Sequence, residues 1–187
     1  MNEGKNNTLS RQKNTVKLAK MGMLVAIALV LVFFIHFPLF PAVPFLEYDP
    51  ADVPIIIGTF AFGPLAGVLL TVVTSVVQGT TVSAASGIYG ILMHIIATGA
   101  FVIVAGLIYK RCKTRKMAVI ALLSGVAAMT LVMIPANLLV TPYFMGIPRE
   151  VIYPLLPVII AFNLTKAGIN AAITFVLYKR ISSFLHK

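Results

Sequence analysis

The feature that most constrains this chain is its longest uncharged segment. From Val53 to Tyr109 the sequence contains no Asp, Glu, Lys or Arg. Water-soluble domains carry roughly a quarter charged residues, so such a segment cannot form a soluble surface. A membrane-spanning helix takes roughly 20 apolar residues, and the segment is long enough for about three of them. Because the whole chain is 59% hydrophobic and only 11% charged, lipid is expected to solvate most of its surface.

The net charge of +10 is concentrated in three basic clusters. They lie in residues 1–20, in residues 110–116 and at the C-terminus: Lys5, Arg11, Lys13, Lys17 and Lys20; Lys110, Arg111, Lys113, Arg115 and Lys116; Lys179, Arg180 and Lys187. Short basic clusters beside apolar spans mark the cytoplasmic face of a membrane protein. No nucleic-acid-binding motif accompanies the charge, so no nucleic-acid partner is expected.

Turn signals divide the chain into six predicted transmembrane helices within one all-α domain, residues 1–187. The predicted spans are 21–36, 54–62, 65–78, 88–109, 117–140 and a sixth that ends near Tyr178. The parity of the spans and the basic clusters predict cytoplasmic termini and a cytoplasmic loop at 110–116. The connections 37–54, 78–87 and 141–150 are then outside. The protein is therefore expected to be a multi-pass protein of the cell membrane.

The second predicted span is unusually short. Nine helical residues rise only about 14 Å, which is less than half of the roughly 30 Å hydrocarbon core. The segment 54–62 is therefore either tilted and extended at its ends or packed inside the bundle, where protein covers it.

The outer loop 37–54 carries three of the chain's five acidic residues, Glu47, Asp49 and Asp52, in the stretch FLEYDPADVP. Its prolines limit its freedom and so the cost of ordering it over a ligand, which suits a lid. Asp52, followed by Pro54, is a helix-start signal. We expect the acids to stay at the loop surface or to cap the next helix.

The sixth predicted span carries the strongest signal for a binding site. Lys166 is its only charge well inside the span, and a charge there costs at least about 2.5–3.5 kcal/mol, so it is expected to face the interior. Asn163, Lys166 and Asn170 are spaced i, i+3, i+7 and share one helix face. The C-terminal basic cluster lies about 18 Å away along the helix, too far for Lys166 to reach the inner interface easily.

Other candidates are weaker when taken singly. Asn137 follows Pro135 and is equally compatible with helix packing and with ligand binding. The stretch GIYGILMH offers Tyr89, Met93 and His94. Tyr89 alone is most simply an interfacial anchor, and His94 a satisfied buried histidine.

Several functional classes lack their motifs. There is no Walker A sequence, no HExxH and no cluster with metal-ligand spacing. No metal, cofactor or catalytic set is therefore expected. Asp49 and Asp52 leave a small metal-dependent membrane phosphotransferase as the alternative from another class. Such sites need several acidic residues, and here only Glu47 lies nearby.

Four motifs in order give the chain a family resemblance. FLEYDPADVP follows the first span, and FGPLAGVLLTVVTSVVQG, GIYGILMH and NLTKAGIN come after it. Over about residues 15–180 this set resembles the riboflavin-specific substrate-capture subunit, or S component, of energy-coupling factor (ECF) vitamin transporters. Another vitamin or a flavin analogue remains an alternative ligand, and a self-sufficient carrier an alternative mode.

The resemblance implies a six-helix bundle that binds one riboflavin near the outer face. It also implies partners, namely a membrane coupling subunit and two ABC-type ATPases, which explains the missing nucleotide motif. The implied lid residues are Phe45, Leu46, Glu47 and Tyr48, and the implied polar contacts are Asn137, Asn163, Lys166 and Asn170, with Tyr89, Met93 and His94 as further candidates. Riboflavin would be the transported ligand rather than a cofactor.

The resemblance also implies small residues on the first helix that seat against the coupling subunit. Gly22 and Ala26 have the required four-residue spacing, which lets helices approach closely. The alternative is that the two residues pack within the bundle.

Overall fold

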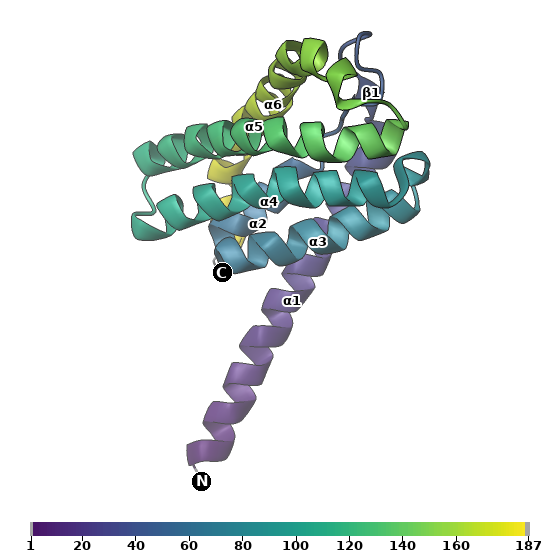
Figure 1. Cartoon of the computed structure of the whole chain (residues 1–187). Coiled ribbons are helices and arrows are strands. Elements are labelled where there is room, and N and C mark those ends of the chain that lie inside the picture. The colour runs from purple at the N-terminus through teal and green to yellow at the C-terminus, as the bar shows by residue number, and fades with distance from the viewer. Residues whose placement is uncertain (1, 186–187) are drawn as a thin grey trace.

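The computed structural model describes residues 2–185, with side chains for residues 11–12 and 14–178. The described chain is almost entirely helical, which confirms the all-α class (Figure 1). The main helices are α1 (Asn2–Phe34), α2 (Asp52–Phe62), α3 (Pro64–Thr80), α4 (Gly87–Arg111), α5 (Arg115–Met145) and α6 (Leu156–Leu185). Short 3-10 helices are η1 (Ala84–Ser86), η2 (Arg149–Val151) and η3 (Tyr153–Leu155).

A small antiparallel sheet orders the loop after α1. Strand β1 (Phe37–Pro38) pairs with β2 (Glu47–Tyr48), with Phe37 opposite Tyr48. The rings of Phe37 and Tyr48 also pack together, with centroids 5.5 Å apart. The segment between α1 and α2 is therefore a folded hairpin.

Four helical segments of the described chain are long and apolar enough to cross a membrane: Asn14–Phe34, Ala84–Arg111, Arg115–Met145 and Arg149–Tyr178. Helices α2 and α3 are shorter. The prediction of a short second helix is confirmed, and the position of α2 explains its length. Every residue from Asp52 to Phe60 is buried, so protein covers α2, as the second of the two alternatives requires.

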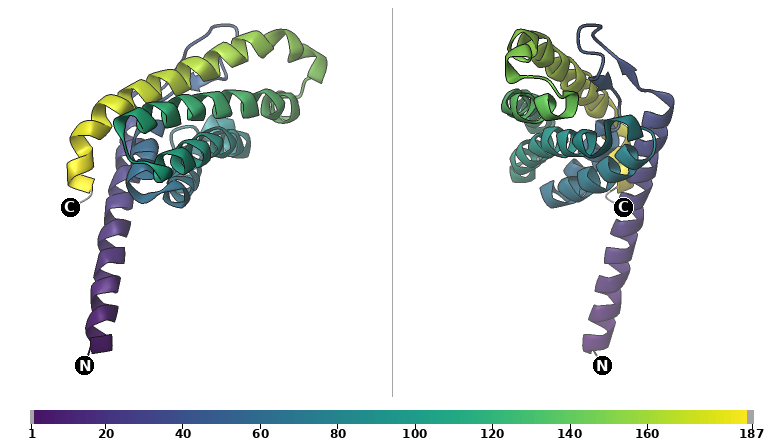
Figure 2. Two further views of the ribbon diagram at one scale, coloured as in Figure 1. Left: turned by 90° about the vertical axis from the view of Figure 1, so that its left-hand side faces the viewer. Right: turned by 45° about the vertical axis from the view of Figure 1, so that its right-hand side comes forward.

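The helices pack in chain order around α2. Helix α4 lies between α3 and α5, and α6 packs against α5 (Figure 1). Helix α1 crosses the others steeply and extends well beyond them at its N-terminal end (Figure 2). The hairpin and the α3–α4 and α5–α6 connections gather at one end of the bundle, while the α4–α5 turn lies at the other (Figure 1).

Two helices extend beyond the predicted spans. Helix α1 already begins at Asn2, before the predicted span 21–36, and α5 continues to Met145, beyond the predicted span 117–140. Thr141 Oγ1 donates to Asn137 Oδ1 (3.0 Å), which bonds the turn just before Pro142. Gly146 then ends the helix with a positive φ of 64°, a conformation that glycine adopts without steric cost. Residues 141–145 of the predicted outer loop 141–150 therefore belong to α5.

An aromatic cluster closes the bundle near the α4–α5 turn. Phe60 stacks on Tyr109, with ring centroids 4.2 Å apart, and the hydroxyls of Tyr109 and Tyr178 are 2.9 Å apart. These three rings join α2, α4 and α6. The hydroxyl pair satisfies two polar groups that would otherwise be costly in an apolar interior.

The close packing of α2 on α3 gives a stability prediction. A Cβ at Gly67 would overlap Thr59 Oγ1, and that hydroxyl is already bonded to the Ile55 carbonyl (2.8 Å). We expect Gly67→Ala to lower the free energy of unfolding by about 1–3 kcal/mol, the usual cost of overpacking. Thermal unfolding in detergent measures the change.

Gly99→Ala is the matched control, because Gly99 is buried in α4 but a Cβ there meets nothing within 4 Å. It should be neutral or slightly stabilising, since alanine is the better helix former. Equal destabilisation by both variants would contradict the packing described.

Candidate ligand-binding site

One cavity opens between the hairpin and the helices. It holds about 740 Å³ of empty space, counting its open mouth. The loop 45–49 covers it, and α3 to α6 form its walls. The lining residues are Phe45, Leu46, Glu47, Asp49, Ser75, Gln78, Gly79, Ser83, Ser86, Gly90, Ile91, Met93, His94, Ala97, Met129, Met133, Phe162, Asn163 and Lys166.

The polar face of α6 binds the loop before α2. Lys166 Nζ donates to Asp49 Oδ2 at 2.8 Å, and both side chains are buried. Asn170 Nδ2 lies 3.1 Å from the Asp49 carbonyl oxygen and 3.1 Å from Asp52 Oδ2. Tyr48 Oη donates to Asn170 Oδ1 at 3.0 Å. The predicted polar face of α6 is therefore confirmed for Lys166 and Asn170. Most of the hydrogen bonds that these two side chains make go to the protein's own loop before α2.

The Tyr48 hydroxyl acts here as a donor. Burial raises the pKa of this phenol above its ordinary value, and the negative charge of Asp49 adds to the effect. Tyr48 therefore stays protonated at neutral pH.

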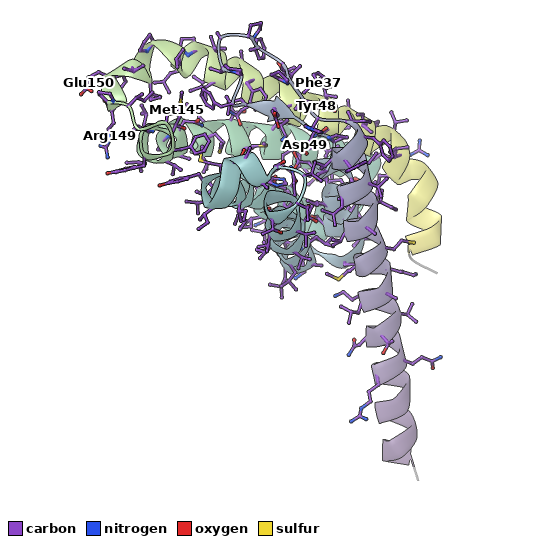
Figure 3. All side chains as sticks on the ribbon, turned by 90° about the vertical axis from the view of Figure 1, so that its right-hand side faces the viewer. Phe37, Tyr48, Asp49, Met145, Arg149 and Glu150 are labelled. Carbon is purple, nitrogen blue, oxygen red and sulfur yellow. The ribbon has the colours of Figure 1, made fainter. Side chains whose placement is uncertain are left out.

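Figure 3 shows Tyr48 and Asp49 beside the end of α1, across the view from Met145, Arg149 and Glu150 at the α5–α6 connection.

Asp52 joins α4 to the same network. Its Oδ1 accepts a bond from Thr98 Oγ1 (2.6 Å) and lies 3.2 Å from His94 Nε2. The carboxylate therefore contacts α4 through one oxygen and Asn170 of α6 through the other.

The prediction that the acids stay at the surface or cap a helix is wrong for Asp49 and Asp52. Their exposed fractions are 5% and 3%. The residue before α2 is Ala51, and no side chain caps that helix. A buried lysine needs an opposite charge, and Asp49 is that partner. Glu47 alone lies exposed, as expected.

Seven of the eleven predicted binding residues line the cavity: Phe45, Leu46, Glu47, Met93, His94, Asn163 and Lys166. Tyr48 and Asn170 lie in the network beside it. Tyr89 is exposed and packs against Phe144. Asn137 is wholly buried, does not line the cavity, and bonds within its own helix, with Nδ2 donating to the Met133 carbonyl (2.8 Å).

The sequence did not single out several residues that the cavity contains. The pair Met129 and Met133 stands at i, i+4, a spacing that would have marked one face of α5. Phe162 precedes Asn163 directly. The sequence predicts a helix end and a loop for the small polar residues of 75–86, and nothing in their spacing indicates a shared wall.

The cavity suits a largely uncharged, flat ligand. Aromatic and thioether side chains offer apolar, polarisable contacts, while Asn163 and Lys166 supply a few polar groups. Asn163 Nδ2 donates one hydrogen bond, to the Ile159 carbonyl at 2.8 Å, so its Oδ1 and its second N–H are left for a ligand. Among the described residues no group of three His, Cys, Asp or Glu side chains could hold a metal ion.

Gly22 and Ala26 both lie exposed on α1. A Cβ at Gly22 would meet nothing within 4 Å, whereas Leu24 and Ala28 face the bundle. The two small residues therefore do not pack within the bundle.

The buried ion pair predicts a non-additive pair of mutations. Asp49→Asn keeps an acceptor for the Ala51 amide (3.1 Å) but removes the charge beside Lys166. We expect it to destabilise the protein by about 3–5 kcal/mol, because it leaves a buried charge unpaired. The double variant Asp49→Asn/Lys166→Met should recover much of that loss. Thermal unfolding of both single variants and the double variant measures the coupling, and additive losses would contradict it.

Comparisons with known proteins agree with this geometry. The chain matches the model of the family "ECF transporter, substrate-specific component" over residues 16–178. It is 30% identical to the riboflavin transporter RibU of Staphylococcus aureus (strain TCH60), over 96% of both chains. It is 35% identical to the riboflavin transporter FmnP of Bacillus subtilis (strain 168), over 63% of this chain and 62% of that protein.

A solved structure of the S component of a bacterial ECF transporter has the same fold. Its TM-score is 0.81 at 30% sequence identity, and the match covers 93% of this chain and 99% of that one. The family predicted from the four motifs is therefore confirmed, and the protein belongs to the substrate-specific components of ECF transporters.

Proposed function

We propose that this protein captures riboflavin at the outer face of the cell membrane and delivers it to an ATP-driven ECF importer. The observation that carries the proposal is the cavity. It has apolar and aromatic walls, a few polar groups, and a roof that the hairpin already holds in place. The relatives named as riboflavin transporters support the choice of ligand.

The chemistry of the cavity matches riboflavin. The vitamin is uncharged, with a flat ring system and a polyol tail. Phe45, Phe162 and the methionines would pack on the ring faces, and Asn163 and Lys166 would bond its polar edge. An anionic vitamin would need more cations, because Asp49 already neutralises the charge of Lys166.

The same proposal assigns an orientation. The hairpin and the α3–α4 and α5–α6 connections would face outward, with both termini in the cytoplasm. The basic segment 110–116 covers the end of α4, the α4–α5 turn and the start of α5. It supports this orientation because it lies at the opposite end of the bundle (Figure 1).

The proposed partners are a membrane coupling subunit and two ABC-type ATPases, which membership of the ECF transporter family supports. They would supply the ATP hydrolysis for which the sequence has no Walker A motif. The exposed Gly22 and Ala26 would seat α1 on the coupling subunit. Riboflavin uptake that needs no ATPase partner would instead indicate a self-sufficient carrier.

We infer that the protein is not an enzyme and holds no cofactor. In the alternative phosphotransferase, Asp49 and Asp52 would need free oxygens for a metal ion. Lys166, Thr98, His94 and Asn170 occupy those carboxylates instead. Activity that chelators abolish would favour the enzyme.

Riboflavin binding is the direct test. The purified protein should show flavin absorbance, and the ligand-free form should bind riboflavin in a fluorescence titration. Asn163→Ala should weaken binding by about 1–3 kcal/mol, the cost of a lost buried hydrogen bond. Thr174→Val, on the same helix and outside the cavity, is the control and should bind normally. If Asn163→Ala bound riboflavin with unchanged affinity, riboflavin would not bind at Asn163 and the proposed site would be wrong.

The single cysteine tests the orientation. Cys112 is exposed in the α4–α5 turn, so in intact cells it should resist a membrane-impermeant maleimide. It should react once the membrane is permeabilised. Replacing Cys112 with Ser should abolish the signal and serves as the control. Labelling from outside would refute cytoplasmic placement of this turn.

A further inference from the structure

One wall of the cavity has no charged residue and no role in the site described above. It is formed by the end of α3, by η1 and by the start of α4. Its members are Ser75, Gln78, Gly79, Ser83, Ser86 and Gly90. They belong to the segment from Val53 to Tyr109 that contains no Asp, Glu, Lys or Arg.

Gln78 is the central residue of this wall. Its side chain is buried, with an exposed fraction of 8%. Its Nε2 donates weakly to Ser83 Oγ at 3.4 Å, but its Oε1 is buried and has no hydrogen-bond partner in the described part of the chain. A buried acceptor without a donor is costly, and such exceptions call for an explanation. A donor supplied by a ligand in the cavity is one.

The neighbouring serines extend the pattern. Ser75 Oγ donates to the Thr71 carbonyl at 2.6 Å, so it has only lone pairs left for a ligand. Ser83 Oγ accepts from Gln78, so its own proton remains available. The wall thus accepts hydrogen bonds at Gln78 and Ser75 and donates one at Ser83.

Tight packing holds these groups in place. A Cβ at Gly79 would overlap the side chain of Ile91, so the end of α3 lies directly against α4. The backbone around Gln78 is therefore fixed, and the chain reverses through η1 within a few residues. A wall fixed in this way costs little ordering when a ligand binds.

We propose that this wall is a polyol subsite, and that Gln78 with Ser75 and Ser83 binds the ribityl chain of riboflavin. The inference rests on the proposed function and adds to it. Each hydroxyl of a polyol both donates and accepts, which matches the groups on the wall. A phosphate or carboxylate only accepts, so it would face the oxygens of Gln78 and Ser75 without a cation to balance it.

The arrangement also orients the ligand. The aromatic and thioether side chains of Phe162, Met129 and Met133 lie on α5 and α6, away from this polar wall. The ring system would occupy that side and its polyol tail would point to α3. Discrimination between flavins with and without the tail would then depend on α3, whereas ring recognition would not.

The test compares two flavins on one variant. Riboflavin and lumiflavin share the ring system, but lumiflavin carries a methyl group in place of the ribityl chain. Gln78→Met keeps the length of the side chain and removes its acceptor. We expect riboflavin affinity to fall about 10-fold, while lumiflavin affinity changes by less than about 2-fold. Fluorescence titration of the ligand-free protein measures both.

Two further variants sharpen the comparison. Thr74→Val is the matched control, because Thr74 is also a buried, unpartnered residue of α3 but does not line the cavity. It should leave both affinities unchanged. Ser83→Ala removes the donor and should weaken riboflavin alone, by a smaller factor.

The outcomes separate the two proposals. Equal losses for both flavins in Gln78→Met, or no loss for riboflavin, would overturn the polyol subsite while the riboflavin function stands. Unmodified protein that binds neither flavin would overturn the function itself, and the subsite with it.

Discussion

A lysine buried in the last helix needs an opposite charge, and the rest of the site depends on how the chain supplies it. Lys166 and Asp49 are 117 positions apart in sequence, yet their charged atoms lie 2.8 Å apart. Removing either partner would leave a buried charge in an apolar bundle. The hairpin and the start of α2 are therefore tied to α6, and this tie determines where the roof of the cavity lies.

The network beside that ion pair explains why α2 can be so short. Asp52 contacts α4 through Thr98 and α6 through Asn170, so the beginning of α2 is fixed by hydrogen bonds on both sides. The helix does not need to span the membrane, because neighbouring helices cover it. The same bonds hold the roof of the cavity before any ligand arrives, which lowers the cost of ordering it on binding.

The sequence predicts the helices and the polar face of α6, but it does not predict that Asp49 and Asp52 bind to that face. The spacing of Asn163, Lys166 and Asn170 defines a helix face by local geometry alone. Which acid would meet that face depends on a contact over more than a hundred residues, and local spacing carries no such information. The end of α5 also differs from the prediction, which placed residues 141–150 in an outer loop, whereas α5 runs through Pro142 and ends at Met145.

The buried charges and the neutral wall divide the work of recognition. Lys166 and Asp49 pair with each other, and Asp52 is bonded by Thr98 and Asn170, so the protein bears the cost of burying these charges whether or not a ligand is bound. A ligand gains little from a charge that is already paired. What remains for it are apolar faces, the N–H groups of Lys166 that Asp49 does not use, and unpaired neutral groups such as Asn163 Oδ1 and Gln78 Oε1. Such a cavity selects a ligand by its shape and hydrogen-bonding pattern. A charged competitor would lose its hydration on entering and would gain no opposite charge in the cavity.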